Sequence, residues 1–170
     1  RPASTTWGAP LEPLGNGMRD AVGPGAYALR EDVAELTSHG APVIQPLRVA
    51  SAYSVAHQDT DPRGLPVIGG DGKPGGVVKD IWIDSAEMVF RYLEVQTEGK
   101  AGARNVLLPI PFARIRRNQV EVHAIYGMHF ADVPLTRHPD QVTKREEDQI
   151  SAYYGAGTLY ADPSRSEPLI

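Results

Sequence analysis

Residues 77–96 read VVKDIWIDSAEMVFRYLEVQ and contain two β-strand patterns joined by a short polar turn. Along residues 77–84 the side chains alternate between two faces, and β-branched and aromatic residues are frequent, as in a half-buried strand. Residues 88–96 are a set of apolar β-formers that only Arg91 and Glu94 interrupt. The sequence therefore predicts a β-hairpin in which residues 84–87 form the loop.

Shorter strand patterns follow this hairpin, and turn residues separate them. A glycine-dense turn at residues 69–76 leads into the hairpin, and Arg117 and Asn118 form a two-residue turn further along. About five or six short strands at such spacing predict a mainly β fold, namely a small antiparallel barrel. The shorter strands are expected at residues 106–108, 113–116 and 119–124.

A helix is predicted to begin after Thr143. Thr143 and Glu146 form a capping box, in which each side chain satisfies a backbone N–H of the first helical turn. Between residues 150 and 154 apolar side chains recur at helical spacing. Gly155 is expected to end this C-terminal helix, because glycine favours the left-handed conformation of a helix stop.

The first part of the chain has a different character, because glycine and proline interrupt it constantly. These residues set turns, so long regular elements do not fit between them. We expect residues 1–63 to form a loop-rich arm that packs on a partner surface. Residues 64–142 are expected to form the barrel, and residues 143–170 the C-terminal helix and a tail.

Composition excludes several classes of function. The 170 residues carry a formal charge of −4, which argues against a general nucleic-acid binder. The chain has no cysteine, so disulfides, thiolate metal sites and a cysteine nucleophile are excluded. The five histidines do not have metal-ligand spacing, and neither a serine nucleophile motif nor a phosphate-binding loop is present.

No segment approaches the about 18–20 apolar residues that a membrane helix needs. The chain begins at Arg1 without an initiator methionine or a signal-like segment. We therefore expect a fragment or a processed chain whose true N-terminus lies upstream.

Three carboxylates cluster near the hairpin loop, at Asp80, Asp84 and Glu87. Neighbouring acids raise one another's proton affinity and can relay protons near neutral pH. The alternative is that they are ordinary solvated turn residues, and spacing alone favours this second interpretation.

A basic cluster, Arg114-Ile115-Arg116-Arg117, stands out in this acidic chain. It could contact lipid headgroups, an acidic partner or RNA. It could equally be a charged strand edge that prevents pairing with other sheets.

Six longer strings stand in a fixed order: DAVGPGAY (20–27), DPRGLPV (61–67), VKDIWID (78–84), FRYLEV (90–95), VTKREED (142–148) and SAYYGAGTLYA (151–161). Together they resemble the H subunit of the photosynthetic reaction centre of purple bacteria, from about Gly8 to the end of the chain. The resemblance implies a PRC-type β-barrel. It also implies a single N-terminal membrane helix, which would lie upstream of this chain.

The resemblance implies a structural and proton-conducting subunit rather than an enzyme. Such a subunit carries no pigment, caps the L and M subunits at the cytoplasmic face of the inner membrane, and guides protons to the secondary quinone. The expected partners are therefore L, M and membrane lipid headgroups, with an antenna or a cytochrome subunit as further candidates and no nucleic acid. No cofactor is expected on this chain alone. Bacteriochlorophyll, bacteriopheophytin, quinones and a non-haem iron would lie on the partner subunits.

The resemblance also assigns roles to individual residues. The family's acid near the quinone matches Glu87, the aspartate that ends the preceding strand is Asp84, and the following arginine is Arg91. These three would form the proton relay, whereas Asp80 is expected to be structural. Some members have an aspartate and two histidines where protons are taken up, and only His39 remains here. His39 is therefore the candidate for proton uptake, and no metal site is expected.

Two alternatives belong to other classes. A soluble PRC-barrel adaptor, like the ribosome-maturation factors that share this barrel, would bind RNA or protein. A hydrolase that uses the carboxylates of Asp84 and Glu87 would need a cleft and would turn over substrate without partners.

Overall fold

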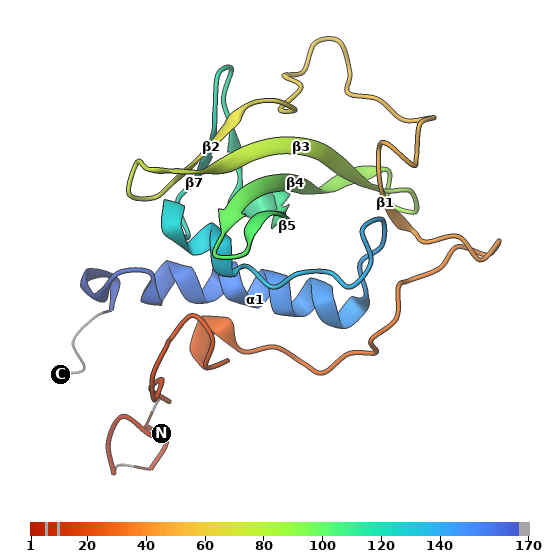
Figure 1. Ribbon diagram of the computed structural model, residues 1–170. Helices are drawn as coiled ribbons and strands as arrows, with labels where there is room; N and C mark the ends of the chain where they lie inside the picture. Colours follow the sequence, from red (N-terminus) through yellow and green to blue (C-terminus); the bar gives the residue numbers. More distant parts are fainter. Residues whose placement is uncertain (6, 10, 167–170) are drawn as a thin grey trace.

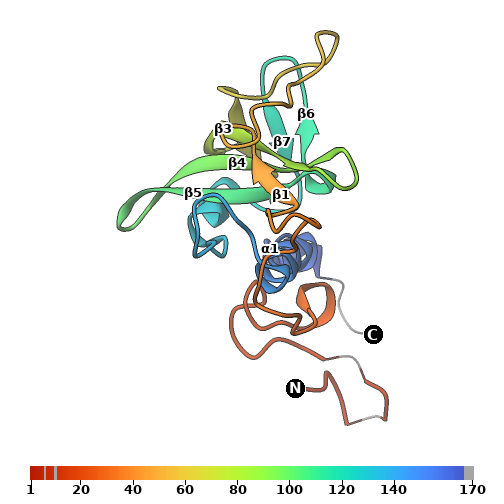
Figure 2. The same cartoon turned by 90° about the vertical axis from the view of Figure 1, so that its right-hand side faces the viewer.

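The computed structural model describes residues 1–5, 7–9 and 11–166. Within this part of the chain, a seven-stranded sheet lies over one α-helix, α1 (Lys144–Tyr160). The N-terminal segment runs along the side of α1 that faces away from the sheet (Figure 1, Figure 2). The helix is therefore enclosed between the sheet and the arm.

The centre of the sheet is the predicted hairpin. It consists of β3 (Pro74–Asp84) and β4 (Val89–Gly99), and β5 (Gly102–Pro109) continues it on the outer side of β4. All three strands pair antiparallel, and β3 has irregular register after Val78 and after Trp82. The hairpin prediction is confirmed, with strands that extend further than the sequence pattern indicated.

The other half of the sheet is built from short strands. β2 (Pro66–Gly69) pairs with β3, β7 (Val120–Val122) pairs with β2, and β6 (Arg114–Ile115) forms the edge. β1 (Ile44–Pro46) pairs with the end of β3. The predicted turn at residues 117–118 therefore joins β6 to β7.

Two features correct the prediction of an antiparallel barrel. The β2–β7 pair is parallel, so the sheet is mixed. The described strands run in the order β5-β4-β3-β2-β7-β6, and the outer strands β5 and β6 do not pair with each other. Pro109 and Pro111 stand where β5 ends, and proline cannot donate to a strand ladder, so the chain leaves the sheet there. The sheet is not closed into a barrel.

The predicted start of the helix is confirmed. Thr143 Oγ1 accepts a hydrogen bond from the Glu146 backbone N–H at 3.0 Å. Glu146 in turn accepts one from the Thr143 N–H at 2.9 Å. This reciprocal pair is the capping box of α1.

The predicted stop at Gly155 is wrong, because α1 continues to Tyr160. Gly155 lies where the arm packs against the helix. A Cβ atom at this position would lie 2.7 Å from the carbonyl oxygen of Pro24 in the arm. The arm forms a 3-10 turn at this point, η1 (Gly23–Gly25), and packs directly on the helix. Glycine is therefore required by the close approach of the arm. Of the predicted tail, residues 167–170 lie outside the described residues.

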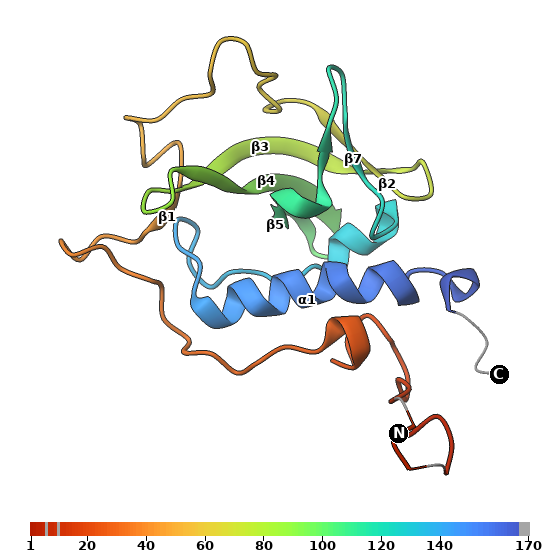
Figure 3. The same ribbon diagram turned by 180° about the vertical axis from the view of Figure 1, so that it is seen from behind.

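Figure 3 shows the sheet and α1 from behind, and the buried apolar side chains of the core come from both. Trp82, Phe130 and Tyr154 are its largest fully buried side chains. The rings of Phe130 and Tyr154 meet edge to face at a centroid distance of 6.3 Å. No helix among the described residues has the length and apolar composition needed to cross a membrane.

Candidate functional site

The candidate site is the turn between β3 and β4, where the chain reverses directly after Asp84. One carboxylate oxygen of Asp84, Oδ1, accepts hydrogen bonds from the backbone N–H groups of Ala86 and Glu87, both at 2.9 Å. Met88 completes the turn with a positive φ of 55°. The aspartate therefore fixes the shape of the loop that presents Glu87.

Asp84 is buried although it is charged. Its second oxygen, Oδ2, accepts a hydrogen bond from Arg91 Nε at 3.1 Å. Asp84 is 6% exposed, and the Arg91 side chain is about half exposed on the neighbouring strand β4. The carboxylate is thus satisfied by two backbone donors and one guanidinium, which makes its burial tolerable.

The structure brings Asp84 and Arg91 into direct contact but joins Glu87 to them only through its backbone. In this chain the Glu87 side chain is exposed at the tip of the hairpin. Its neighbours Met88 and Val89 are also exposed, at 63% and 43%. The tip therefore offers one carboxylate with apolar side chains beside it.

His39 lies in a separate exposed loop that precedes β1. Its ring Nδ1 is 3.3 Å from the hydroxyl of Ser38. The loop and the β3–β4 turn lie at the same end of the sheet (Figure 1, Figure 3). Among the described residues, no group of three or more histidine, aspartate and glutamate side chains could hold a metal ion.

Sequence reasoning missed a second charged cluster, in which Arg48 bridges two buried acids. Asp80 and Glu94 are direct partners on β3 and β4, and each is at most 5% exposed. Arg48 Nη1 lies 3.3 Å from Asp80 Oδ2 and 2.9 Å from Glu94 Oε1. Glu94 also accepts hydrogen bonds from Trp82 Nε1 at 3.0 Å and Asn105 Nδ2 at 3.1 Å. Asp80 thus lies in an ion-pair cluster separate from the turn that presents Glu87.

A partly buried acid, Glu147, lies in the first turn of α1. The Tyr92 hydroxyl donates to Glu147 Oε1 at 2.8 Å, across the boundary between sheet and helix. Burial raises the pKa of Glu147 above its usual value, although the Tyr92 hydrogen bond and the positive charge of Arg30 oppose this shift. The pKa of Tyr92 is raised as well, chiefly by burial.

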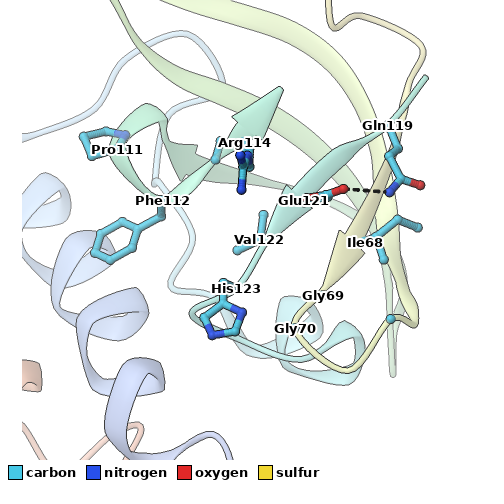
Figure 4. Close-up of a pocket in the computed structure, with 12 residues that line it drawn as sticks. Ile68, Gly69, Gly70, Pro111, Phe112, Arg114, Gln119, Glu121, Val122 and His123 are labelled. Atoms are coloured by element: carbon cyan, nitrogen blue, oxygen red, sulfur yellow. Dashed lines mark hydrogen bonds between the residues drawn. The ribbon is translucent and has the colours of Figure 1, made fainter. Parts of the chain in front are cut away.

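A hollow of about 480 Å³ lies between the end of β2, the segment around Phe112 and strand β7 (Figure 4). Glu121 of β7 and His123, directly after that strand, form part of its wall, and Phe112 and Arg114 come from the segment before β7. Gln119 Nε2 donates to Glu121 Oε1 at 3.1 Å. Neither Asp84, Glu87, Arg91 nor His39 lines this hollow.

Two regions of the chain match known protein families. Residues 55–129, which contain β2 to β7, match the PRC-barrel domain. Residues 1–49, the larger part of the arm, match the N-terminal region of the photosynthetic reaction centre H chain. The chain therefore combines the N-terminal region of a reaction centre H chain with a PRC-barrel domain. The resemblance found in the sequence is confirmed, and the match of the arm distinguishes this chain from a soluble PRC-barrel adaptor.

Proposed function

We propose that this chain caps the quinone-reducing side of a reaction centre at the cytoplasmic face of the membrane and guides protons to the secondary quinone. Its partners would be the L and M subunits, which would hold the pigments, the quinones and the non-haem iron. The observation that carries the proposal is the ion pair between the buried Asp84 and the half-exposed Arg91, directly behind the exposed carboxylate of Glu87.

The proposed chemistry is proton relay by Glu87. A quinone that accepts two electrons must also take up two protons, and a buried quinone needs a path for them. Docking of the hairpin tip against a partner would remove Glu87 from water, and burial favours the protonated form of a carboxylate. The negative charge of Asp84 would strengthen this preference, whereas Arg91 would oppose it. Glu87 could then gain and lose protons near neutral pH.

The arm would supply part of the docking surface. Among its residues, Leu29, Val33 and Leu36 are 76%, 55% and 57% exposed. Large apolar side chains that stay exposed along an extended segment are suited to a protein interface. Residues 1–63 would then pack on partner subunits, and residues 64–142 would contain the proton relay. Residues 143–170 would pack against the arm and support it. His39, at the same end as the hairpin tip, is the proposed point of proton uptake.

The proposal is tested with Glu87→Gln in the assembled complex. Glutamine keeps the shape of the side chain but cannot carry a proton, so the proton-coupled second electron transfer should slow by about tenfold or more. The first electron transfer and the assembly of the complex should stay unchanged. Flash-induced absorbance kinetics measures both steps.

Glu98→Gln is the matched control, because Glu98 is also an exposed glutamate but lies at the other end of β4. This variant should have the wild-type rate. A Glu87→Gln complex that transfers the second electron at the wild-type rate would exclude Glu87 from the proton path.

A further inference from the structure

The tip of the β6–β7 hairpin concentrates positive charge in an otherwise acidic chain. Arg114, Arg116 and Arg117 are all exposed, and Ile115 between them is 37% exposed. The hairpin projects from the sheet on the side opposite to α1 (Figure 1, Figure 2). The tip of the hairpin is therefore not covered by the helix or by the arm.

Little within the described part of the chain neutralises these charges. Arg116 Nε lies 3.6 Å from Glu121 Oε2, and both side chains are more than one third exposed, so this pair contributes little. Within the described residues no hydrogen bond or ion pair engages the side chains of Arg114 or Arg117, although the charge of Arg114 attracts the carboxylate of Glu121. By contrast, Arg48 and Arg91 are each held by a buried carboxylate.

We infer that this hairpin tip binds the phosphate groups of anionic lipids at the membrane surface. Guanidinium groups pair with phosphate oxygens through two parallel N–H donors, and each basic residue near an anionic bilayer adds to the attraction. The ladder that pairs Arg114 with Glu121 and Ile115 with Val120 holds the tip in shape. Ile115 pairs with the fully buried Val120, so its side chain lies on the core-facing side of the hairpin and leaves the other side to Arg114.

The sequence of the hairpin favours a lipid surface over RNA. Proteins that bind single-stranded nucleic acid combine basic side chains with aromatic rings on which bases stack. Residues 114–122 contain no aromatic side chain. The inference rests on the proposed function, because only a subunit of a membrane complex is held close to headgroups.

The test measures binding of the 170-residue chain to vesicles by co-sedimentation. Vesicles of phosphatidylcholine and phosphatidylglycerol in about a two-to-one ratio are compared with pure phosphatidylcholine at about 0.1 M salt. One variant replaces the three arginines of the tip with glutamine. The control removes the same charge from exposed lysines elsewhere on the surface, as Lys73→Gln, Lys79→Gln and Lys100→Gln.

The wild-type chain should prefer the anionic vesicles, and each arginine removed should weaken binding about fivefold. The lysine control should lose far less affinity for the anionic vesicles. Equal losses in both variants would show that only net charge matters and would overturn the inference. So would a wild-type chain without preference for phosphatidylglycerol, or a tip variant that loses affinity for a single-stranded RNA but keeps vesicle binding. The assay involves no quinone, so its failure would leave the kinetic test of Glu87 unaffected.

Discussion

At the scale of single residues, His129 shows how a charge state can be coupled to the fold. Its Nδ1 accepts a hydrogen bond from the backbone N–H of Tyr126 at 3.0 Å, and the two rings stack at 5.7 Å. The contact closes the first turn of a 3-10 helix, η3 (Gly127–Asp132). Because Nδ1 must be unprotonated to accept this bond, the folded chain favours the neutral imidazole. Burial accordingly lowers the pKa of His129 from its usual 6.5.

This shift predicts a loss of stability in mild acid. The unfolded chain binds the proton first, so the free energy of unfolding should fall as the pH drops below about 6.5. His129→Asn keeps an acceptor oxygen close to the position of Nδ1 but does not titrate. The variant should therefore lack the part of the pH dependence between pH 7.5 and 5.5 that belongs to His129. Urea unfolding at several pH values measures it, and equal slopes in both proteins would contradict the prediction.

The sequence predicted the position of Asp84 at the end of a strand, but it did not predict the contacts of the other buried acids. Asp84 could be placed at the end of a strand because the alternating pattern ends there and turn residues follow. The contact of Arg48 with Asp80 and Glu94 could not be predicted, because it joins segments that are 32 and 46 residues apart. Two acids in one sheet do indicate a need for a cation, but the sequence does not show which one.

At the scale of elements, Arg48 ties the end of the arm to the sheet. Besides the two buried acids, its Nη2 donates to the carbonyl oxygen of Pro139 at 2.6 Å and to Asp140 at 2.9 Å. The segment after β1, the hairpin β3–β4 and the segment before α1 therefore share one guanidinium. Among the described arginines, this one connects the matched H-chain region to the matched barrel domain.

Arg48→Met should destabilise the chain by about 2–4 kcal/mol, because methionine leaves two buried carboxylates without their cation. This loss of stability lies toward the low end of what is expected when a buried ion pair is broken, because the Arg48 side chain is 40% exposed. Arg63→Met is the control, because Arg63 pairs with the exposed Asp61 and should cost less than about 1 kcal/mol. Chemical denaturation of both variants measures the difference. Similar losses in the two would show that the cluster does not hold the arm.

The elements themselves were predicted to different degrees. The long hairpin and the helix start carry strong local signals, namely alternation and a capping box, and both are confirmed. The end of α1 was misplaced, because Gly155 serves contact with the arm and the sequence does not reveal that contact. The parallel β2–β7 pair was missed for a similar reason: it joins strands about 50 residues apart, and nothing local specifies their direction.

At the scale of the whole molecule, contacts with α1 determine the path of the arm. Arg145 Nε donates to the carbonyl oxygen of Arg30 at 3.0 Å, and Thr143 Oγ1 donates to Asp32 at 2.8 Å. Nearer the end of the helix, a Cβ atom on Gly25 would lie 2.9 Å from the Cβ atom of Ala156, so the arm and α1 are in close contact there. The arm thus lies along the helix from its first turn to its last third, and presents its outer side for partners.

The central claim is that this molecule works as part of a pigment-containing reaction centre. The most direct measurement is a near-infrared absorption spectrum of the complex that co-purifies with the tagged chain from detergent-solubilised membranes of photosynthetically grown cells. We expect bacteriochlorophyll and bacteriopheophytin bands at a fixed ratio to the chain. A colourless preparation from such cells would contradict the account.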